Sequence, residues 1–124
     1  MRIWNKPRGY GKTTRMLYAS EYTGKSIVVA TKERAHTLES YAKQLGLIIP
    51  KVLCANDFLD RETYCSQDII VDEAFDVLQA LITGVRPGIK ISDATLTCYE
   101  GVRLDTSDSY FKEKYKKYFE ENKL

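Results

Sequence analysis

Residues 11–14 read GKTT and combine three kinds of group that bind nucleotide phosphates. Gly11 lets the backbone approach a phosphate closely, Lys12 carries the charge that reaches the β- and γ-phosphates, and the hydroxyl of Thr13 can hold Mg²⁺. Thr14 is placed to contact the α-phosphate or to cap the helix that follows. By itself, GKT also fits a plain glycine turn before a helix, so a second motif is needed to decide between the two interpretations.

The second motif is an acidic pair, Asp72 and Glu73, directly after the apolar run at 68–71. A carboxylate at the end of a buried strand can hold Mg²⁺ through its water shell, and the next one can orient or deprotonate a water molecule. An isolated pair of this kind is usually a solvated turn. Because the GKT loop and the acidic pair occur together, the sequence predicts Mg²⁺-dependent binding and hydrolysis of a nucleoside triphosphate, with ATP as the expected nucleotide.

The elements that must position these residues alternate between short apolar runs and longer amphipathic stretches. Strand-like runs lie at 2–5, 26–31, 51–55, 68–71 and within 90–99, and helical patterns lie at 13–21, 32–45, 56–61, 75–82 and 109–124. This alternation is typical of a parallel α/β fold with ligand loops at the carboxyl ends of the strands. We therefore predict one domain over residues 1–124, with a C-terminal helix at about 109–124.

With these two motifs the chain resembles the additional-strand, catalytic-glutamate branch of P-loop NTPases, which includes RecA-like helicases and large phage terminases. The resemblance implies a three-layer α/β/α sandwich with a parallel five-stranded sheet in the order 5-1-4-3-2, in which the Walker B strand lies beside the P-loop strand. It implies catalytic roles for Lys12 and Glu73 and metal-binding roles for Thr13 and Asp72. It also suggests a minimal phage or mobile-element protein that acts with DNA or RNA, with a protein partner or as a homo-oligomer.

The loop departs from the pattern G-x-x-x-x-G-K-[ST], because Lys6 stands where the first glycine belongs. Large terminases often carry a degenerate Walker A with arginine three residues before Gly-Lys-Thr, and Arg8 matches that variant. The resemblance makes Arg8 a candidate arginine finger within the same chain; the alternative is that it pairs with a phosphate or a surface carboxylate. The nucleotide-binding residues that it implies are Arg8, Gly9, Tyr10, Gly11, Lys12, Thr13 and Thr14.

Two further segments resemble functional positions of helicase-like ATPases. Lys32 and Arg34 follow the second strand-like run and are candidate nucleic-acid contacts; the alternative is a solvated basic helix face. Thr95 and Thr97 lie in the fifth run and are candidate sensors of the γ-phosphate, although an ordinary β-strand would have the same sequence.

Composition limits the other classes of function. Hydrophobic residues make up 44% and charged residues 29%, and the net charge of +2 is too small to indicate nucleic-acid binding by itself. Three separated cysteines and a single histidine do not match the ligand spacing of a structural zinc site. Because no apolar run approaches a membrane span, we expect no membrane partner and a cytoplasmic protein, in the host cytoplasm if it is phage-encoded.

Two alternative functions stay open. In the first, nucleotide binding shapes a surface that engages or inhibits a protein partner, with little or no hydrolysis. In the second, the chain is a nucleoside or nucleotide kinase, although neither a lid nor an acceptor pocket is visible in the sequence.

Overall fold

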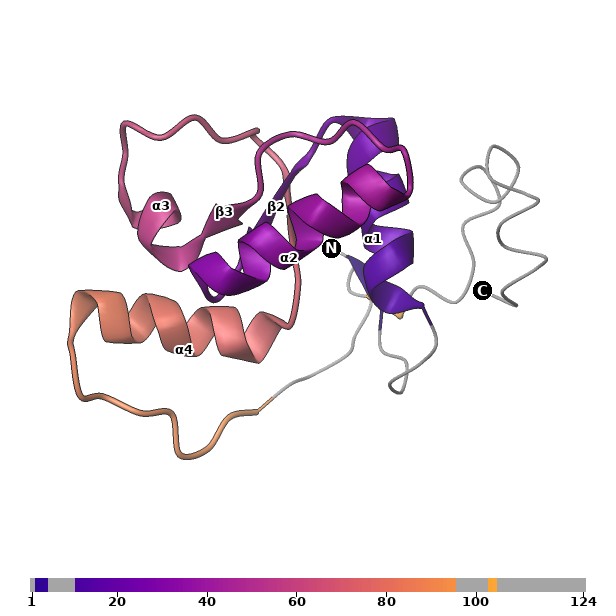
Figure 1. The fold of residues 1–124 in the computed structure, drawn as a ribbon. Coiled ribbons are helices and arrows are strands. Elements are labelled where there is room, and N and C mark those ends of the chain that lie inside the picture. The colour runs from indigo at the N-terminus through magenta and orange to yellow at the C-terminus, as the bar shows by residue number, and fades with distance from the viewer. Residues whose placement is uncertain (1, 5–10, 96–102, 105–124) are drawn as a thin grey trace. The chain divides into compact units, whose positions relative to one another are not determined.

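The computed structural model describes residues 2–4, 11–95 and 103–104 (Figure 1). The chain divides into two compact units, one made of Met1–Arg15 and Asp93–Leu124 and the other of Met16–Ser92. Helix α1 (Lys12–Thr23) begins in the first unit and continues into the second.

The first unit contains a two-stranded parallel sheet. Strand β1 (Arg2–Ile3) pairs with β5 (Arg103–Leu104), so that each residue of β1 lies opposite one residue of β5. Trp4 directly follows β1, and Arg15 from the first turn of α1 lies over its ring. The residues Trp4 and Arg15, one on each side of residues 5–10, are therefore in contact.

The second unit is built on a three-stranded parallel sheet in the order β3-β2-β4. Its strands are β2 (Ser26–Val29), β3 (Leu53–Cys54) and β4 (Ile69–Val71). All four residues of β2 are buried, which fits the central position of this short β-branched run. Strand β4 lies at the edge of these three strands and is only partly buried.

Besides the part of α1 from Met16 onward, the second unit contains α2 (Lys32–Gln44), α3 (Ala55–Leu59) and α4 (Ala74–Val85). Helix α2 packs against β2 and β3 through residues at helical spacing, and α3 lies beside α4 (Figure 1). Val28, Leu53 and Val77 form a buried cluster that joins β2, β3 and α4. Successive side chains of a strand point to opposite faces, so the fully buried Ile27 and Val29 close the other face of β2.

The predicted RecA-like sandwich with a five-stranded sheet in the order 5-1-4-3-2 is wrong. Among the described residues the largest sheet has three strands, and β2 lies between β3 and β4, which the predicted order would make neighbours. The apolar β2 takes the central position because both of its faces are covered, whereas β4 has an exposed Val71 at its end. The chain has mixed α/β character and four described helices.

Several predicted boundaries also change. The expected strand within 90–99 is not formed at 90–95, where the chain is irregular and mostly exposed, and β5 lies further along. Helix α3 starts at Ala55 after Cys54, one residue before the predicted start of the helical pattern at 56–61. The helix predicted at 109–124 lies outside the described residues, and the single-domain assignment stays a prediction.

None of the helices in the described ranges has the length and apolar character needed to cross a membrane.

Candidate functional site

The GKTT segment forms the start of α1. Gly11 has a left-handed backbone with φ of 74°, a conformation that glycine adopts without steric cost. Its carbonyl oxygen accepts a hydrogen bond from the Arg15 N–H at 2.9 Å, which makes it the first acceptor of the helix. Lys12 and Thr13 are half-buried and Thr14 is buried. The first turn contains no acidic residue, so nothing in it opposes the attraction of a helix N-terminus for an anion.

Arg15, the residue after GKTT, was not singled out by sequence reasoning. It is only 7% exposed, and its guanidinium carbon lies 5.2 Å from the centroid of the Trp4 ring. An arginine over a tryptophan face is a favourable cation–π contact. Since Trp4 and Arg15 lie at either end of the predicted loop, they are candidate positioning residues for it. The sequence signal that could have indicated this contact is an aromatic residue before the loop and a basic residue after it.

Several predicted site residues lie outside the described residues: Arg8, Gly9, Tyr10 and Thr97. Thr95 is described, and it is exposed and belongs to no helix or strand. Their roles stay predictions.

The acidic pair lies at the junction of β4 and α4. The backbone N–H of Asp72 donates to the Val28 carbonyl oxygen at 3.1 Å, so the sheet still holds the chain at this residue. Glu73 then turns the chain with φ of 55° and ψ of 72° and precedes α4. Of the non-glycine residues described, Glu73 alone has a positive φ. Such backbone strain is costly and gathers at functional positions.

Asp72 is bound by an arginine from another element. Both Nε and Nη2 of Arg34 lie 3.1 Å from Oδ2 of Asp72. The aspartate side chain is 10% exposed and the arginine side chain 38%. Of the two predicted nucleic-acid contacts, Arg34 therefore has its guanidinium on a carboxylate, whereas Lys32 is exposed at the start of α2.

The Arg34–Asp72 pair lies where the carboxyl ends of β2 and β4 meet. From β2 the chain continues through α2 to β3 on one side, whereas β4 lies on the other side of β2. In open α/β sheets, ligands bind outside the carboxyl ends of strands where the connections diverge in this way. Asp72 and Glu73 therefore occupy a position suited to ligand chemistry within the second unit.

The donor chemistry of the predicted metal ligands suits Mg²⁺. Asp72 offers a carboxylate and Thr13 a hydroxyl, and Mg²⁺ prefers such hard oxygen donors. Within residues 2–4, 11–95 and 103–104, no three His, Cys, Asp or Glu side chains form a group able to hold a metal ion. Mg²⁺ bound with a nucleotide needs only one or two carboxylates, because phosphates and waters complete its shell.

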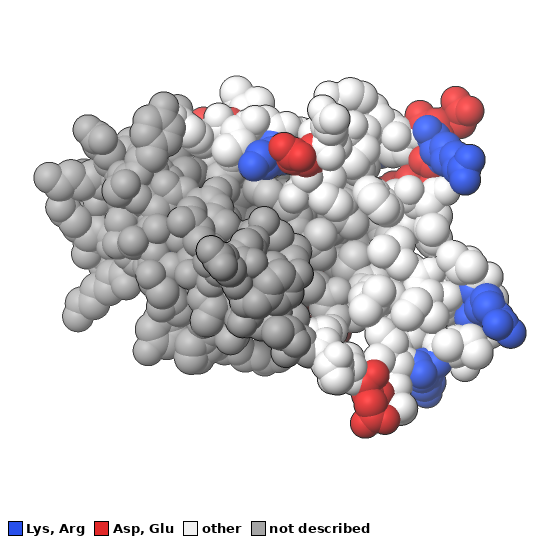
Figure 2. Space-filling view, turned by 180° about the vertical axis from the view of Figure 1, so that it is seen from behind, with Lys and Arg blue, Asp and Glu red and all other residues white. Residues whose placement is uncertain are grey.

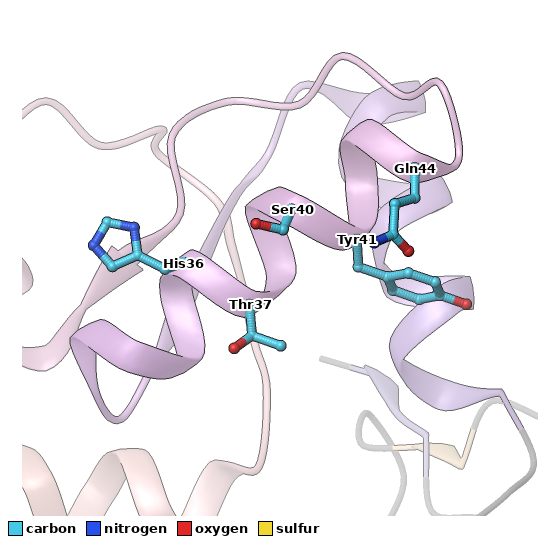
Figure 3. Close-up of a pocket in the computed structure, with 5 residues that line it drawn as sticks. All are labelled: His36, Thr37, Ser40, Tyr41 and Gln44. Atoms are coloured by element: carbon cyan, nitrogen blue, oxygen red, sulfur yellow. The ribbon is translucent and has the colours of Figure 1, made fainter.

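A shallow hollow lies elsewhere, along helix α2 (Figure 3). All of its lining side chains belong to this one helix: His36, Thr37, Ser40, Tyr41 and Gln44. Charged side chains on the face shown in Figure 2 lie singly or in small mixed groups around a largely uncharged area. The hollow therefore does not bring together groups from several elements, as the junction of β4 and α4 does.

No family model matches the sequence, and no curated protein or solved structure is significantly similar to it. The function is therefore inferred from the residues and their local geometry.

Proposed function

We propose that this protein binds and hydrolyses a nucleoside triphosphate, with ATP as the first candidate, in the presence of Mg²⁺. The observation that carries the proposal is the start of α1. The left-handed Gly11 is followed at once by Lys12 and Thr13 in a first helical turn without acidic residues. Phosphates bind at helix N-termini of this composition because backbone N–H groups and the helix dipole both favour negative charge.

Each motif takes a separate role. Lys12 neutralises the β- and γ-phosphates, and Thr13 and Asp72 are each kept as a candidate ligand that would hold the metal ion. Mg²⁺ bound with the nucleotide would offset the charge that develops on the phosphoryl oxygens. Glu73 orients the attacking water and accepts its proton as the bond between the β- and γ-phosphates breaks. Arg8 is kept as a candidate for stabilising the transferred phosphoryl group.

The junction of β4 and α4 supports these roles. Asp72 remains hydrogen-bonded to β2 through its backbone, which fixes the point from which its carboxylate projects. Glu73 keeps a strained backbone although glycine would adopt it freely. A carboxylate at such a position is expected to serve a purpose that glycine could not.

A second candidate is a nucleotide-gated module that binds a protein partner and hydrolyses slowly or not at all. The Arg34–Asp72 ion pair favours it, because a carboxylate held at 3.1 Å by a guanidinium is less available to a metal ion. In either case the partner is expected to be a nucleic acid or a protein that senses the bound nucleotide.

Trp4 provides a direct test, because it is the single tryptophan of the chain and lies beside Arg15 of α1. Binding of ATP and GTP with Mg²⁺ can be followed by its fluorescence, and turnover by phosphate release with and without single- and double-stranded DNA. Lys12→Ala should abolish binding, and Glu73→Gln should keep binding but lose turnover. The matched control Lys90→Ala removes an exposed lysine outside the helices and should behave as wild type.

The outcomes separate the two candidates. Turnover that depends on Glu73 and increases with DNA supports a motor-like NTPase. Tight binding with the same negligible turnover in wild type and Glu73→Gln supports the gated module. Triphosphate affinity unchanged by Lys12→Ala would remove the nucleotide site from this loop.

A further inference from the structure

The contact between Arg34 and Asp72 uses one carboxylate oxygen for two donors. Nε and Nη2 of Arg34 both lie 3.1 Å from Oδ2. Because the Asp72 side chain is only 10% exposed, its negative charge is poorly solvated and gains from a cationic partner. The guanidinium therefore occupies the carboxylate that the proposed function assigns to Mg²⁺.

The backbone of Arg34 is also fixed. Its N–H donates to the Thr31 hydroxyl oxygen at 3.2 Å, which caps α2. A positive side chain in the first turn of a helix is disfavoured by the helix dipole. Asp72 offsets this cost, so the ion pair ties the start of α2 to the end of β4.

We propose that Arg34 is a positioning residue that holds Asp72 when no metal is bound and competes with Mg²⁺ for its Oδ2 oxygen. This inference rests on the proposed function, in which Asp72 is a metal ligand. A divalent cation at this carboxylate would repel the guanidinium, and the cation and the guanidinium would compete for the same Oδ2 oxygen. Entry of the metal ion therefore displaces Arg34 and releases the first turn of α2 from β4.

This exchange links occupancy of the metal site to the exposed surface of α2. The first turn of α2 carries the exposed Lys32 and Glu33 next to Arg34. Once displaced from Asp72, the guanidinium is available to a phosphate group. Occupancy of the metal site then changes the charge that α2 presents.

The test uses Mn²⁺ as a probe for the metal alone, with binding to the full chain measured by the paramagnetic resonance signal of the free ion. Arg34→Gln removes the competing charge and is expected to lower the Kd for Mn²⁺ about tenfold, the factor that corresponds to one lost charge-assisted hydrogen bond. Arg34→Lys keeps the charge and should stay close to wild type. Arg86→Gln removes an exposed arginine after α4 and serves as the matched control.

Two additional measurements separate this competition from a purely structural role. Raising the salt concentration should narrow the difference between wild type and Arg34→Gln, because salt screens the repulsion at this partly exposed arginine. Asp72→Asn should weaken Mn²⁺ binding whether residue 34 is arginine or glutamine. A merely structural Arg34 predicts weaker metal binding in Arg34→Gln, with no rescue by lysine.

Each result decides the matter. Tighter Mn²⁺ binding by Arg34→Gln, reproduced by Arg34→Met, supports the proposal. Unchanged or weaker binding by the folded variants overturns it, and so does failure of both neutral variants to fold. If wild type binds Mg²⁺–ATP but the variants show no shift, only this inference fails; if wild type binds neither ATP nor Mn²⁺, the proposed function fails with it.

Discussion

Arg15 lies over the indole ring of Trp4, with 5.2 Å between its guanidinium carbon and the ring centroid. Trp4 follows β1 and Arg15 belongs to the first turn of α1, so the contact joins the two elements that flank residues 5–10. Arg15 is 7% exposed, and a desolvated cation over a tryptophan face contributes about 2 kcal/mol. The pair therefore fixes where α1 starts relative to β1.

We expect Arg15→Met to lower the free energy of unfolding by about 2 kcal/mol, because methionine keeps an apolar stem but loses the cation–π contact. The emission of Trp4 should shift to longer wavelength as its ring becomes more hydrated. Urea unfolding followed by circular dichroism and by Trp4 fluorescence measures both effects. Arg86→Met, at an exposed position, is the control; an equal loss in the two variants would contradict the assignment.

At position 73 a glycine variant should be more stable than an alanine variant, which is the reverse of the order found within helices. Its φ of 55° is left-handed, and a side chain there costs about 1 kcal/mol or more that glycine does not incur. Glu73→Gly is therefore expected to be more stable than Glu73→Ala by about 1 kcal/mol, although both lack the carboxylate. Chemical denaturation of the two variants measures the difference.

The matched comparison is Asp76, which lies in the first turn of the same helix. Within a helix, alanine is more stable than glycine by about 1 kcal/mol, so the order of Asp76→Gly and Asp76→Ala should be the opposite. If alanine is also the better residue at position 73, Glu73 is not strained. Both Glu73 variants should lose nucleotide turnover, whatever their stability.

Helix α2 and strand β2 could be predicted from the sequence because their local signals agree with their burial. Ala35, Leu38 and Ala42 have helical spacing and are buried, and the Thr31 hydroxyl caps the helix. The run at 26–29 is β-branched and entirely buried. In α2 the helical spacing decides both the element and its inner face, and in β2 the continuous apolar run indicates a strand buried on both faces.

The order of the strands could not be predicted in the same way. Within the described ranges β1, β3 and β5 have two residues each, and such short runs carry almost no information about their neighbours. Strand β4 pairs with β2, although the resemblance required it beside β3. The predicted order came from the resemblance to a family. In the structure, β2, which is buried on both faces, lies between β3 and β4 instead.

The sequence indicated candidate site residues one at a time but not how they pair. Gly11 and Glu73 were singled out by sequence motifs, and both have a positive φ, which is strained only for Glu73. The contact of Arg34 with Asp72 joins residues that are 38 positions apart, and no spacing rule indicates it. The position of the strand ends could have suggested this contact. Arg34 follows β2 and Asp72 follows β4, and the carboxyl ends of paired parallel strands lie at the same edge of the sheet.

The pKa of Asp57 predicts a loss of stability in acid. The backbone N–H and the thiol of Cys54 both donate to Oδ2 of Asp57, at 3.2 and 3.3 Å. These hydrogen bonds, that of the backbone first, hold the pKa of Asp57 below its usual value of 3.8. Because the folded-state pKa is depressed, the stabilisation is present above 3.8 and is lost as the pH falls through the folded-state pKa.

Thermal unfolding of wild type and Asp57→Asn from about pH 6 to about pH 3 tests this expectation. Wild type should be the more stable at the upper end of the range, and the difference should close as Asp57 becomes protonated. Glu62→Gln, at an exposed position in the following loop, should change stability little at any pH. A difference between wild type and Asp57→Asn that does not depend on pH would show that the charge of Asp57 plays no part.

Ser66 should matter more for stability than its place in a loop suggests. The backbone N–H of Ser26 donates to the Ser66 hydroxyl oxygen at 2.7 Å, and the N–H of Ser66 donates to the hydroxyl oxygen of Ser26 at 3.2 Å. Ser66 also donates its hydroxyl to the Asp68 carbonyl oxygen at 2.6 Å. These bonds fix the approach to β4, in which Ile69 lies opposite Ser26.

Ser66→Ala leaves the N–H of Ser26 without this acceptor, and Ser26 is only 2% exposed. A buried donor deprived of its partner costs about 1–3 kcal/mol, and we expect a loss of that size in the free energy of unfolding. Ser40→Ala, at an exposed position in α2, should stay within about 0.5 kcal/mol of wild type. Urea denaturation of the three proteins measures these losses. Equal midpoints for the two variants would mean that water replaces the Ser66 hydroxyl. A loss confined to Ser66→Ala would mean that the contact between Ser26 and Ser66 sets the register of β4, and thereby the position of Asp72.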